Sequence, residues 1–590
     1  MTDVPAIVTR AVGLRRLALG LAQGLCLFLM FQAKEHKVWP ATDLAAFQAL
    51  LLPLLFAPLA AIHAQAHVPG RRLAAWLAAI AAVCAAAGFF DGYKNGGALD
   101  VERWEPGPLL FAAAAGLFIA QALVLAAQAD GRRIAGYSAY FDAAWKHGVQ
   151  AAAGIGFAGA LWLLLNLGAG LFNLIKLTFL SALIHEAWFA IPVTTMALSI
   201  AIHLTDVRAS LVRGIRTLAL TLLSWLLPLL TVIVAGFVVS LPFTGLEPLW
   251  DTNFAAGLLL GVSAALIVLI NAAYQDGLPD TRAHTALRWA MTVAAILPAP
   301  LVAIAAYALT LRVQQHGWTA ERVYALACIA VGGCYALGYL AAAVRRTEPL
   351  KGLERTNIVT SFVVIGILIL LFTPIADPAR IAVASQVARL QEGLISPDAF
   401  DYKYLRFQGG RYGLRALERM KAGEIQVAGV NDRAAAALAL TERHDAVEGA
   451  QAVALDRDHL TANITVSGGA LPEALLSQHA LAPGPSGLPA CLTASSEKCE
   501  GFLLDLNADG TDELVLIPHT GGRPPAILSY DGKEWRSAGT LPARLSCEDM
   551  RARLRARDFK TPPSPWNDLE VGGVRLGVAD RGGATPTVCP

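Results

Sequence analysis

Residues 217–241 read TLALTLLSWLLPLLTVIVAGFVVSL and contain no charged side chain. An apolar helix of about 20 residues is long enough to cross the roughly 30 Å hydrocarbon core of a bilayer. We therefore predict a transmembrane helix here, and this pattern decides the fold because it recurs along the chain. Eleven spans are predicted in all, near residues 14–32, 44–65, 73–90, 107–128, 149–172, 188–205, 217–241, 253–274, 289–311, 323–344 and 356–376.

The composition of the 590-residue chain agrees with a membrane protein. Apolar residues make up 55% of the chain and charged residues only 16%, whereas a soluble protein of this length needs a more charged surface. The net charge of +2 is small, and no basic stripe with interleaved aromatic residues occurs. We therefore expect a lipid bilayer as the main partner and no nucleic acid.

Lysine and arginine in the short loops predict the orientation of the spans, because these residues accumulate in cytoplasmic loops. With the N-terminus in the cytoplasm, that side carries seventeen of them, namely Arg10, Arg15, Arg16, Arg71, Arg72, Arg132, Arg133, Lys146, Arg208, Arg213, Arg216, Arg282, Arg288, Arg345, Arg346, Lys351 and Arg355. The opposite side carries seven, namely Lys34, Lys37, Lys94, Arg103, Lys176, Arg312 and Arg322. An odd number of spans then places the chain after residue 376 outside the cytoplasm.

One stretch leaves this topology open. The residues LFNLIKLTFLSALIHEAWFAIP (171–192) read either as a short re-entrant or interfacial segment, or as a continuation of a neighbouring span. Adding or removing one span there would invert the C-terminal part across the membrane.

Polar side chains in the predicted spans are candidate functional residues, because ionisable groups in hydrocarbon are costly. They are Asn166, Asn173, Lys176, His185, Glu186, His203, Asp206 and Asn271. Such groups indicate either a cavity, a lipid site or an ion path, or side chains that reach water and hydrogen-bond between helices. His185 and Glu186 match the start of the zinc motif HExxH, but Phe189 stands where the second histidine is needed, so a metalloprotease is excluded.

No catalytic residue is assigned from the sequence. It contains no Walker A loop, no GxSxG nucleophile elbow and no dinucleotide fingerprint after a strand. A non-enzymatic protein is therefore favoured over an enzyme.

Four stretches are distinctive: LWLLLNLGAGLFNLI (161–175), GLEPLWDTNFAAGLLLG (245–261), NAAYQDG (271–277) and residues 385–420, of which FDYKYLRFQGGRYG (400–413) is the most specific part. Together they resemble an uncharacterised family of bacterial multi-pass membrane proteins, domain of unknown function 4153, over most of residues 10–420. The resemblance implies a bacterial inner-membrane protein and implies no catalytic residues.

The composition changes after residue 376. Residues 377–420 are predicted to form a juxtamembrane helical segment, and residues 421–590 a periplasmic α+β domain. Short runs such as GFLLDL (501–506) and ELVLIP (513–518), separated by Gly and Asp-Gly turns, predict strands from about residue 460 onward. The predicted fold is a mainly α polytopic membrane helix bundle, residues 1–376, followed by this C-terminal soluble α+β domain.

Four of the eight cysteines lie in the polar C-terminal part: Cys491, Cys499, Cys547 and Cys589. An even set in an extracytoplasmic region predicts two disulfides. The short spacing of Cys491 and Cys499 favours a local bridge between them, and a bridge from Cys547 to Cys589 would tie down the C-terminus. The sequence permits all three pairings.

The stretch DLNADGTDE (505–513) has the spacing of a calcium-binding loop. Side-chain oxygens come from Asp505, Asn507 and Asp509, the carbonyl of Thr511 can serve next, and Glu513 can add a carboxylate. Leu516 stands where an EF-hand needs glutamate, and the flanks read as strands, so helix–loop–helix is excluded. The alternatives are a structural calcium ion and an Asx-rich hairpin turn without an ion.

Three functions follow from these features. The favoured one is a non-enzymatic envelope module that presents its periplasmic domain to a protein partner or to the cell wall. The first alternative is a transporter or channel that uses the intramembrane polar residues. The second is a membrane enzyme acting on lipid-linked substrates, with acid and base roles for His185, Glu186 or His203.

Overall fold

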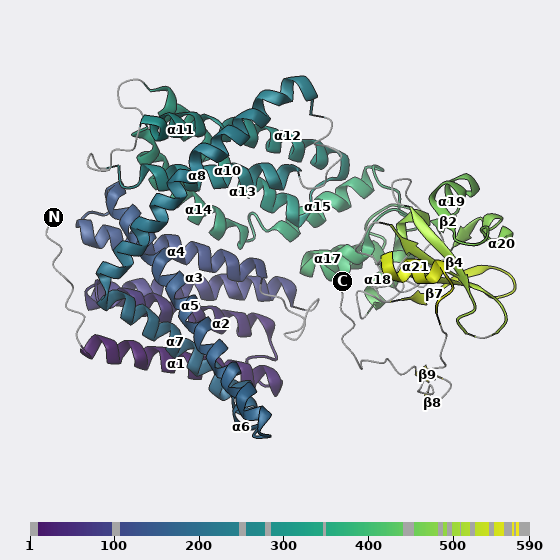
Figure 1. The fold of residues 1–590 in the computed structure, drawn as a ribbon, viewed down its shortest axis with the longest axis horizontal. Helices are drawn as coiled ribbons and strands as arrows, with labels where there is room; N and C mark the ends of the chain where they lie inside the picture. Colours follow the sequence, from purple (N-terminus) through teal and green to yellow (C-terminus); the bar gives the residue numbers. More distant parts are fainter. Residues whose placement is uncertain are drawn as a thin grey trace. The chain divides into compact units, whose positions relative to one another are not determined.

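The computed structural model describes residues 10–96, 107–246, 255–277, 285–345, 350–440, 453–481, 488–492, 498–507, 509–519, 525–541, 548–559, 569–571 and 574–576. The chain divides into two compact units, Met1–Ala435 and Ala436–Pro590, drawn in Figure 1. The boundaries predicted from the sequence, after residues 376 and 420, stay a prediction.

The first unit is built from apolar helices. In chain order they are α1 (Arg10–Glu35), α2 (Leu44–Ala64), α3 (Gly70–Asn95), α4 (Gly107–Asp130), α5 (Tyr137–Leu174), α6 (Phe179–His185), α7 (Ala187–Val207), α8 (Ala209–Thr244), α10 (Ala255–Tyr274), α11 (Thr285–Ile296), α12 (Pro298–His316), α13 (Ala320–Val344) and α14 (Gly352–Leu371). Among the described residues, eleven helical segments are long and apolar enough to cross a membrane, with α11 and α12 forming one segment. This result confirms the predicted membrane helix bundle.

The stretch 171–192 adds no further span within the described residues. The long helix α5 ends at Leu174, and the seven-residue helix α6 follows after a short turn. Glu186 alone separates α6 from α7. A seven-residue helix rises only about 10 Å, so it cannot cross the bilayer.

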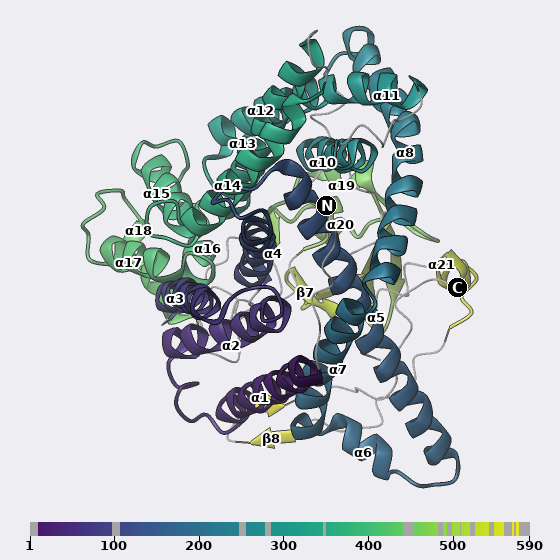
Figure 2. The same ribbon diagram turned by 90° about the vertical axis from the view of Figure 1, so that its left-hand side faces the viewer.

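Glycine allows the first helices to approach closely (Figure 2). Helix α1 packs against α2 and α7, and α2 packs along α3. A Cβ atom on Gly88 of α3 would lie 2.5 Å from the carbonyl oxygen of Gln48 in α2. A Cβ on Gly24 of α1 would lie 2.4 Å from the Cα of Pro192 in α7. Small residues at such crossings bring helix backbones into van der Waals contact where no hydrophobic driving force acts.

The later helices of the unit share one apolar core. Leu266 and Ile270 of α10, Leu301 of α12, Tyr339 of α13 and Leu353 just inside α14 belong to it and are almost fully buried. Each of these helices therefore uses one face for packing, while large apolar side chains elsewhere on it remain exposed, as expected for helices bordered by lipid; these are Leu258, Tyr307, Leu337 and Leu370.

Short helices follow the last span: α15 (Pro378–Gln391), α16 (Tyr402–Phe407), α17 (Gly410–Lys421) and α18 (Val430–Ala439). Asp377 caps α15 by accepting a hydrogen bond from the backbone N–H of Arg380 at 2.9 Å. Arg411 of α17 lies over the ring of Tyr93 at 4.1 Å, and its Nε donates to the carbonyl of Gly96 at 3.1 Å. The block FDYKYLRFQGGRYG thus packs against the end of α3.

The second unit contains a five-stranded sheet in the order β2-β4-β5-β6-β7. Its strands are β2 (Ile464–Val466), β4 (Cys499–Leu504), β5 (Glu513–Pro518), β6 (Ala526–Tyr530) and β7 (Trp535–Thr540), and only the pair β2–β4 is parallel. Also described are β1 (Val453–Ala454), β3 (Ala480–Leu481), β8 (Leu569–Val571), β9 (Val574–Leu576), α19 (Arg457–Asn463), α20 (Glu473–Leu476), α21 (Glu548–Arg555) and the 3₁₀ turn η1 (Ala490–Leu492). This confirms the predicted C-terminal α+β architecture.

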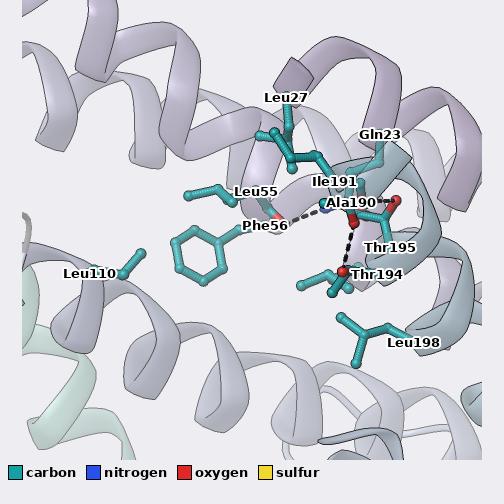
Figure 3. Close-up of a pocket in the computed structure, with 11 residues that line it drawn as sticks. Gln23, Leu27, Leu55, Phe56, Leu110, Ala190, Ile191, Thr194, Thr195 and Leu198 are labelled. Carbon is teal, nitrogen blue, oxygen red and sulfur yellow. Dashed lines mark hydrogen bonds between the residues drawn. The ribbon is translucent and has the colours of Figure 1, made fainter. Parts of the chain in front are cut away.

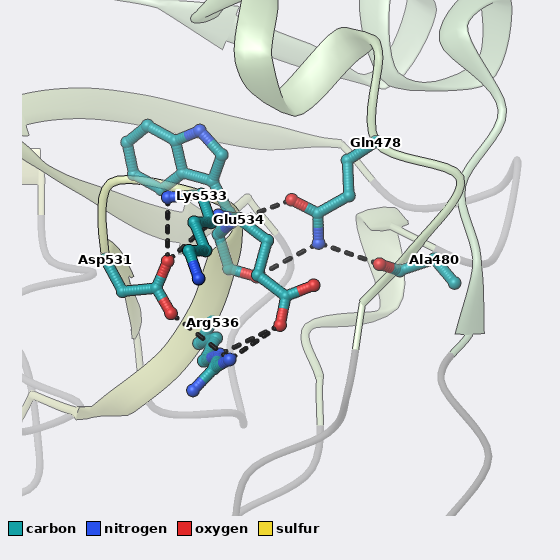
Figure 4. Close-up of polar contacts among 7 residues, drawn as sticks. Gln478, Ala480, Asp531, Lys533, Glu534 and Arg536 are labelled. Carbon is teal, nitrogen blue, oxygen red and sulfur yellow. Dashed lines mark hydrogen bonds and ion pairs between the residues drawn. The ribbon is translucent and has the colours of Figure 1, made fainter.

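Two local features hold this sheet together. A disulfide joins Cys491 of η1 to Cys499 of β4, and both residues are buried in the core. The side chain of Gln478 donates to the carbonyls of Ala480 and Trp535 at 2.7 and 3.0 Å and accepts from the Trp535 N–H at 2.7 Å (Figure 4). Gln478 therefore satisfies backbone groups at the start of β7, the edge strand of the sheet in the described residues.

Candidate functional site

A cluster of charged side chains lies among α1, α2, α5 and α7, at the end of the bundle where α1 begins and α2 ends. We call it the charged cluster and define it as Arg16, His63, His67, Lys146, His147, Gln150 and Asp206. Asp206, one residue before the end of α7, is its centre. Its Oδ2 accepts from Nη2 of Arg16 at 2.5 Å, and its Oδ1 accepts from Nζ of Lys146 at 3.0 Å and Nε2 of Gln150 at 2.8 Å.

Burial makes these contacts strong. None of the Arg16 side chain and only 3% of the Asp206 side chain is exposed, whereas Lys146 is 35% exposed. Charged groups attract one another more strongly where water is excluded, but removing each of them from water is costly. The arrangement is therefore favourable only because Arg16, Lys146 and Gln150 all contact the carboxylate of Asp206.

Three histidines of the charged cluster, His63, His67 and His147, lie beside these charged groups. The ammonium of Lys146 donates to Nε2 of His67 at 3.1 Å, since lysine has no acceptor. Burial, followed by the nearby Lys146 charge, lowers the pKa of His67 below its ordinary value, so this ring is held neutral. His63 and His147 meet edge to face with ring centroids 5.4 Å apart.

Arg16 is incompletely paired. Its Nε and Nη1 are buried and have no hydrogen-bond partner among the described residues. The ring of His203, one turn before Asp206 on α7, lies beside Gly13 of α1, and its buried Nδ1 also has no partner. Buried donors on a charged group are costly to leave unpaired. Near the start of α1, the described neighbours therefore leave three buried polar nitrogens without hydrogen bonds, two on Arg16 and one on His203.

A second polar network joins α10, α13 and α14. Asn271 donates from Nδ2 to the hydroxyl of Tyr339 at 2.7 Å, and its Oδ1 accepts from Asn357 at 2.8 Å. Tyr137 of α5 donates to the same oxygen of Asn271 at 3.2 Å. These neutral groups satisfy one another, so the network serves as a packing contact between spans.

A third polar group lies at the opposite end of the bundle. The ammonium of Lys94, near the end of α3, contacts Asp91 at 3.2 Å and Asp377 at 3.0 Å. Asp377 is fully buried, and Phe372 lies near the same ammonium. Two carboxylates therefore surround one cation at the point where the last span joins α15.

The polar residues predicted from the sequence separate into different places. Asp206 belongs to the charged cluster, His203 lies beside it, and Asn271 lies in the second network. Five others are exposed on the second half of α5 or between α5 and α7: Asn166, Asn173, Lys176, His185 and Glu186. Asn166 donates to the carbonyl of Trp162, and a ring nitrogen of His185 lies 2.6 Å from the carbonyl of Ser181.

Several members of the charged cluster were missed. Arg16 and Lys146 were counted among the loop cations, and His63, His67, His147 and Gln150 were not selected at all. Two histidines close together at the end of one span, His63 in the last turn of α2 and His67 in the turn just after it, are the signal in the sequence that points to them.

An apolar pocket of about 440 Å³ opens among α1, α2, α4 and α7 (Figure 3). Its walls include Leu55, Phe56, Leu59, Leu110 and Leu198. Gln23 lies at its edge, donates to the carbonyls of Leu54 and Leu55, and keeps a buried Oε1 without a partner among the described residues.

The predicted calcium loop is a hairpin turn between β4 and β5. Asp509 accepts from the Thr511 N–H at 2.8 Å, Asn507 accepts from the Asp509 N–H at 3.0 Å, and Asp505 accepts from the Gly510 N–H at 3.1 Å. Glu513 accepts from the Leu506 N–H at 2.8 Å. Within the described residues, no group of three or more His, Cys, Asp and Glu side chains is arranged to hold a metal.

Of the four cysteines predicted to form disulfides, Cys491 and Cys499 are bonded to one another. Cys547 and Cys589 lie outside the described residues.

Comparison with known proteins adds one result. The family model described as Domain of unknown function (DUF4153) matches residues 49–420. This range begins within α2, contains every later span together with α15 and α16, and ends at the last turn of α17. No curated protein and no solved structure matches the chain.

Proposed function

The chain belongs to the DUF4153 family, whose function is unknown, and from this premise we propose that it is a non-enzymatic envelope protein of a bacterial inner membrane. Its eleven spans anchor the C-terminal unit, which faces the periplasm and binds a protein partner or the cell wall. The observation that carries this proposal is the separate compact unit after the spans, which contains the Cys491–Cys499 disulfide.

Two features support the orientation. Lysine and arginine are concentrated in the loops on the side of the N-terminus. A structural disulfide persists in an oxidising compartment and is rare in the cytoplasm. Both features favour a cytoplasmic N-terminus and a periplasmic C-terminal unit.

Fusion proteins test this orientation. Alkaline phosphatase fused after Pro590 is expected to be active, because the enzyme matures only outside the cytoplasm. Green fluorescent protein fused after Arg345, between α13 and α14, is expected to fluoresce in the cytoplasm. The reverse pattern at both sites would overturn the proposed orientation.

Complementation tests the role of the second unit. A chain ending at Ala435 is expected to reach the membrane but not to restore the envelope phenotype of a deletion strain. Full restoration by this truncated chain would exclude the envelope-module proposal.

The charged cluster favours transport as a second candidate, because buried ionisable groups in spans commonly mark substrate or ion paths. This candidate predicts that Asp206→Asn abolishes complementation while the truncation at Ala435 retains it. The truncation therefore separates the two functions, because transport predicts that it restores the phenotype and the envelope module predicts that it does not.

Calcium is proposed as a structural ion of the second unit. It is supported by the sequence spacing of the loop and by Oδ1 of Asp505, which is buried without a partner among the described residues. Such a site in an extracytoplasmic module binds calcium weakly, with a Kd of about 10⁻⁴ to 10⁻³ M.

A further inference from the structure

The charged cluster contains more positive than negative charge. Among its described members, Arg16 and Lys146 are cations and Asp206 is the sole carboxylate, while the three histidines add no negative charge. The cluster therefore carries one unbalanced positive charge, although Arg16 is completely buried. Asp206 balances one of the two cations, so one further anion beside Arg16 and the partly exposed Lys146 would neutralise the cluster.

Asp206 is contacted by Arg16 through Nη2, and Nε and Nη1 do not reach it. Its two oxygens already accept from Arg16, Lys146 and Gln150. Nε and Nη1 of Arg16 have no hydrogen-bond partner among the described residues, and they lie on different edges of the planar guanidinium, since Nε shares its edge with Nη2. Each of these two nitrogens can donate to an oxygen of a phosphate or carboxylate group.

The position of the cluster suits a lipid phosphate. Arg16 lies six residues into α1, His63 lies one residue before the end of α2, and Asp206 lies one residue before the end of α7. At about 1.5 Å per residue, all three are within roughly 10 Å of a helix end. Lipid phosphates occupy this boundary, and basic pockets between spans bind anionic head groups there.

The apolar pocket lies farther along three of the same helices, toward the bilayer centre. Gln23 is seven residues from Arg16 on α1, Leu59 is four from His63 on α2, and Leu198 is eight from Asp206 on α7. These spacings correspond to about 10, 6 and 12 Å along the three helices. On each helix, the pocket residue lies farther from the helix end than the charged residue does.

We propose that Arg16 and Lys146 bind the phosphate of an anionic phospholipid whose acyl chain occupies the apolar pocket between α1, α2, α4 and α7. Lys146 is partly exposed and provides the entrance, whereas Arg16 forms the inner end of the head-group site. The pocket selects an amphiphile over a free anion because apolar side chains form most of its wall.

Binding of lipid to the full-length chain in a neutral detergent tests the proposal. Native mass spectrometry and thermal unfolding are measured with added phosphatidylglycerol, with zwitterionic phosphatidylcholine, and with inorganic phosphate alone. Phosphatidylglycerol is expected to remain bound and to raise the unfolding temperature more than the other two. Equal effects of the two lipids would overturn the head-group assignment, and an equal effect of inorganic phosphate would show a free-anion site without a lipid.

Substitutions locate the head-group site. Lys146→Gln is expected to weaken phosphatidylglycerol binding about tenfold, equivalent to about 1.4 kcal/mol. Arg16→Gln is expected to weaken it further, and Lys146→Gln keeps the test decisive if Arg16→Gln does not fold. Arg132→Gln, an exposed cation in the loop between α4 and α5, is the matched control and should leave binding unchanged. Equal affinities of all three variants would contradict the proposal.

Filling the pocket tests the acyl-chain site separately. Leu198→Trp is expected to reduce lipid binding while the cluster remains intact. Leu164→Trp on the exposed face of α5 is the control, since Leu164 is 66% exposed and lies outside the pocket. Unchanged binding by Leu198→Trp would remove the pocket from the proposal.

Discussion

Arg16 of α1 and Asp206 of α7 are 190 residues apart in sequence and form a buried ion pair with a 2.5 Å contact. The pair joins the first span to a span in the middle of the chain. It also places an arginine that the loop pattern assigns to the cytoplasmic surface inside the helix bundle. A charged residue close to the start of a span can therefore be a structural contact as well as a topology signal.

Asp206→Asn is expected to destabilise the first unit by about 3 to 5 kcal/mol, because it leaves the fully buried Arg16 without a counter-charge. The midpoint of thermal unfolding in detergent measures this effect. Asp142→Asn is the control, since Asp142 pairs with Arg216 at an exposed site and its loss costs about 1 kcal/mol or less. Similar decreases in the unfolding midpoint of both variants would show that the buried pair contributes no more to stability than the exposed pair.

Gly88→Ala is expected to destabilise the α2–α3 contact by about 1 to 3 kcal/mol, because the new Cβ would overlap the backbone of Gln48. Gly156→Ala on α5 is the control, since no atom lies within 4 Å of a Cβ there and alanine favours helix. The two unfolding temperatures should move in opposite directions. An unchanged unfolding temperature of Gly88→Ala would show that α2 and α3 can move apart to accept the methyl group without loss of stability.

Cys499→Ser is expected to lower the stability of the second unit by about 2 to 3 kcal/mol, because the disulfide closes a loop of eight residues. Limited proteolysis of the full chain should then release fragments from this unit first. Cys328→Ser, at an exposed free cysteine in α13, should leave the digestion pattern unchanged. Protection that survives both the substitution and added reductant would contradict this expectation.

The second unit is expected to lose stability in acid through Glu500. Its carboxylate accepts from Nε and Nη2 of Arg555 at 2.6 and 2.7 Å and from Ser467 at 2.7 Å. The hydrogen bonds from Arg555, together with that from Ser467, lower the pKa of Glu500 below its ordinary value of 4.5. Because the folded state binds the proton less tightly, this stabilisation is complete above pH 4.5 and is lost as the pH falls through the lower, folded-state pKa.

Unfolding by denaturant between pH 7 and pH 3 measures this dependence. Glu500→Gln should destabilise the unit at pH 7 and flatten the acid limb of the curve. Glu473→Gln removes an exposed carboxylate, 72% accessible and paired with Arg457, and should leave the curve unchanged. An acid limb that is identical in Glu500→Gln and the parent chain would assign the effect to other carboxylates.

Millimolar calcium is expected to raise the unfolding temperature of the second unit if the β4–β5 loop holds the ion. Asp505→Asn and Asp509→Asn should each reduce this increase, while Asp531→Asn in the separate β6–β7 turn should not. Magnesium at the same concentration should have less effect, since it requires stricter octahedral geometry. The absence of any shift with calcium would leave an ion-free Asx turn as the explanation of the sequence pattern.

Length and hydropathy alone were sufficient to predict the eleven spans, because a span is a property of consecutive residues. The stretch 217–241 shows this directly: an uncharged run of its length fits the bilayer only as a helix, whatever it packs against. The strands β4 and β5 were predicted for a similar reason, because alternating apolar residues and flanking turns are also local signals. Strand β7 was missed, since Trp535–Thr540 is polar and gains its pairing from β6 and Gln478.

Contacts between residues far apart in sequence were decided only by the tertiary structure. Lys94 and Arg16 both looked like loop cations, yet Lys94 lies between Asp91 and Asp377, and Arg16 pairs with Asp206. Whether a charge near a span end meets water or another helix depends on which helices are neighbours. The sequence therefore determined that this chain crosses a membrane and carries a separate α+β unit, and only the packing of α1, α2, α5 and α7 decided where its charges meet.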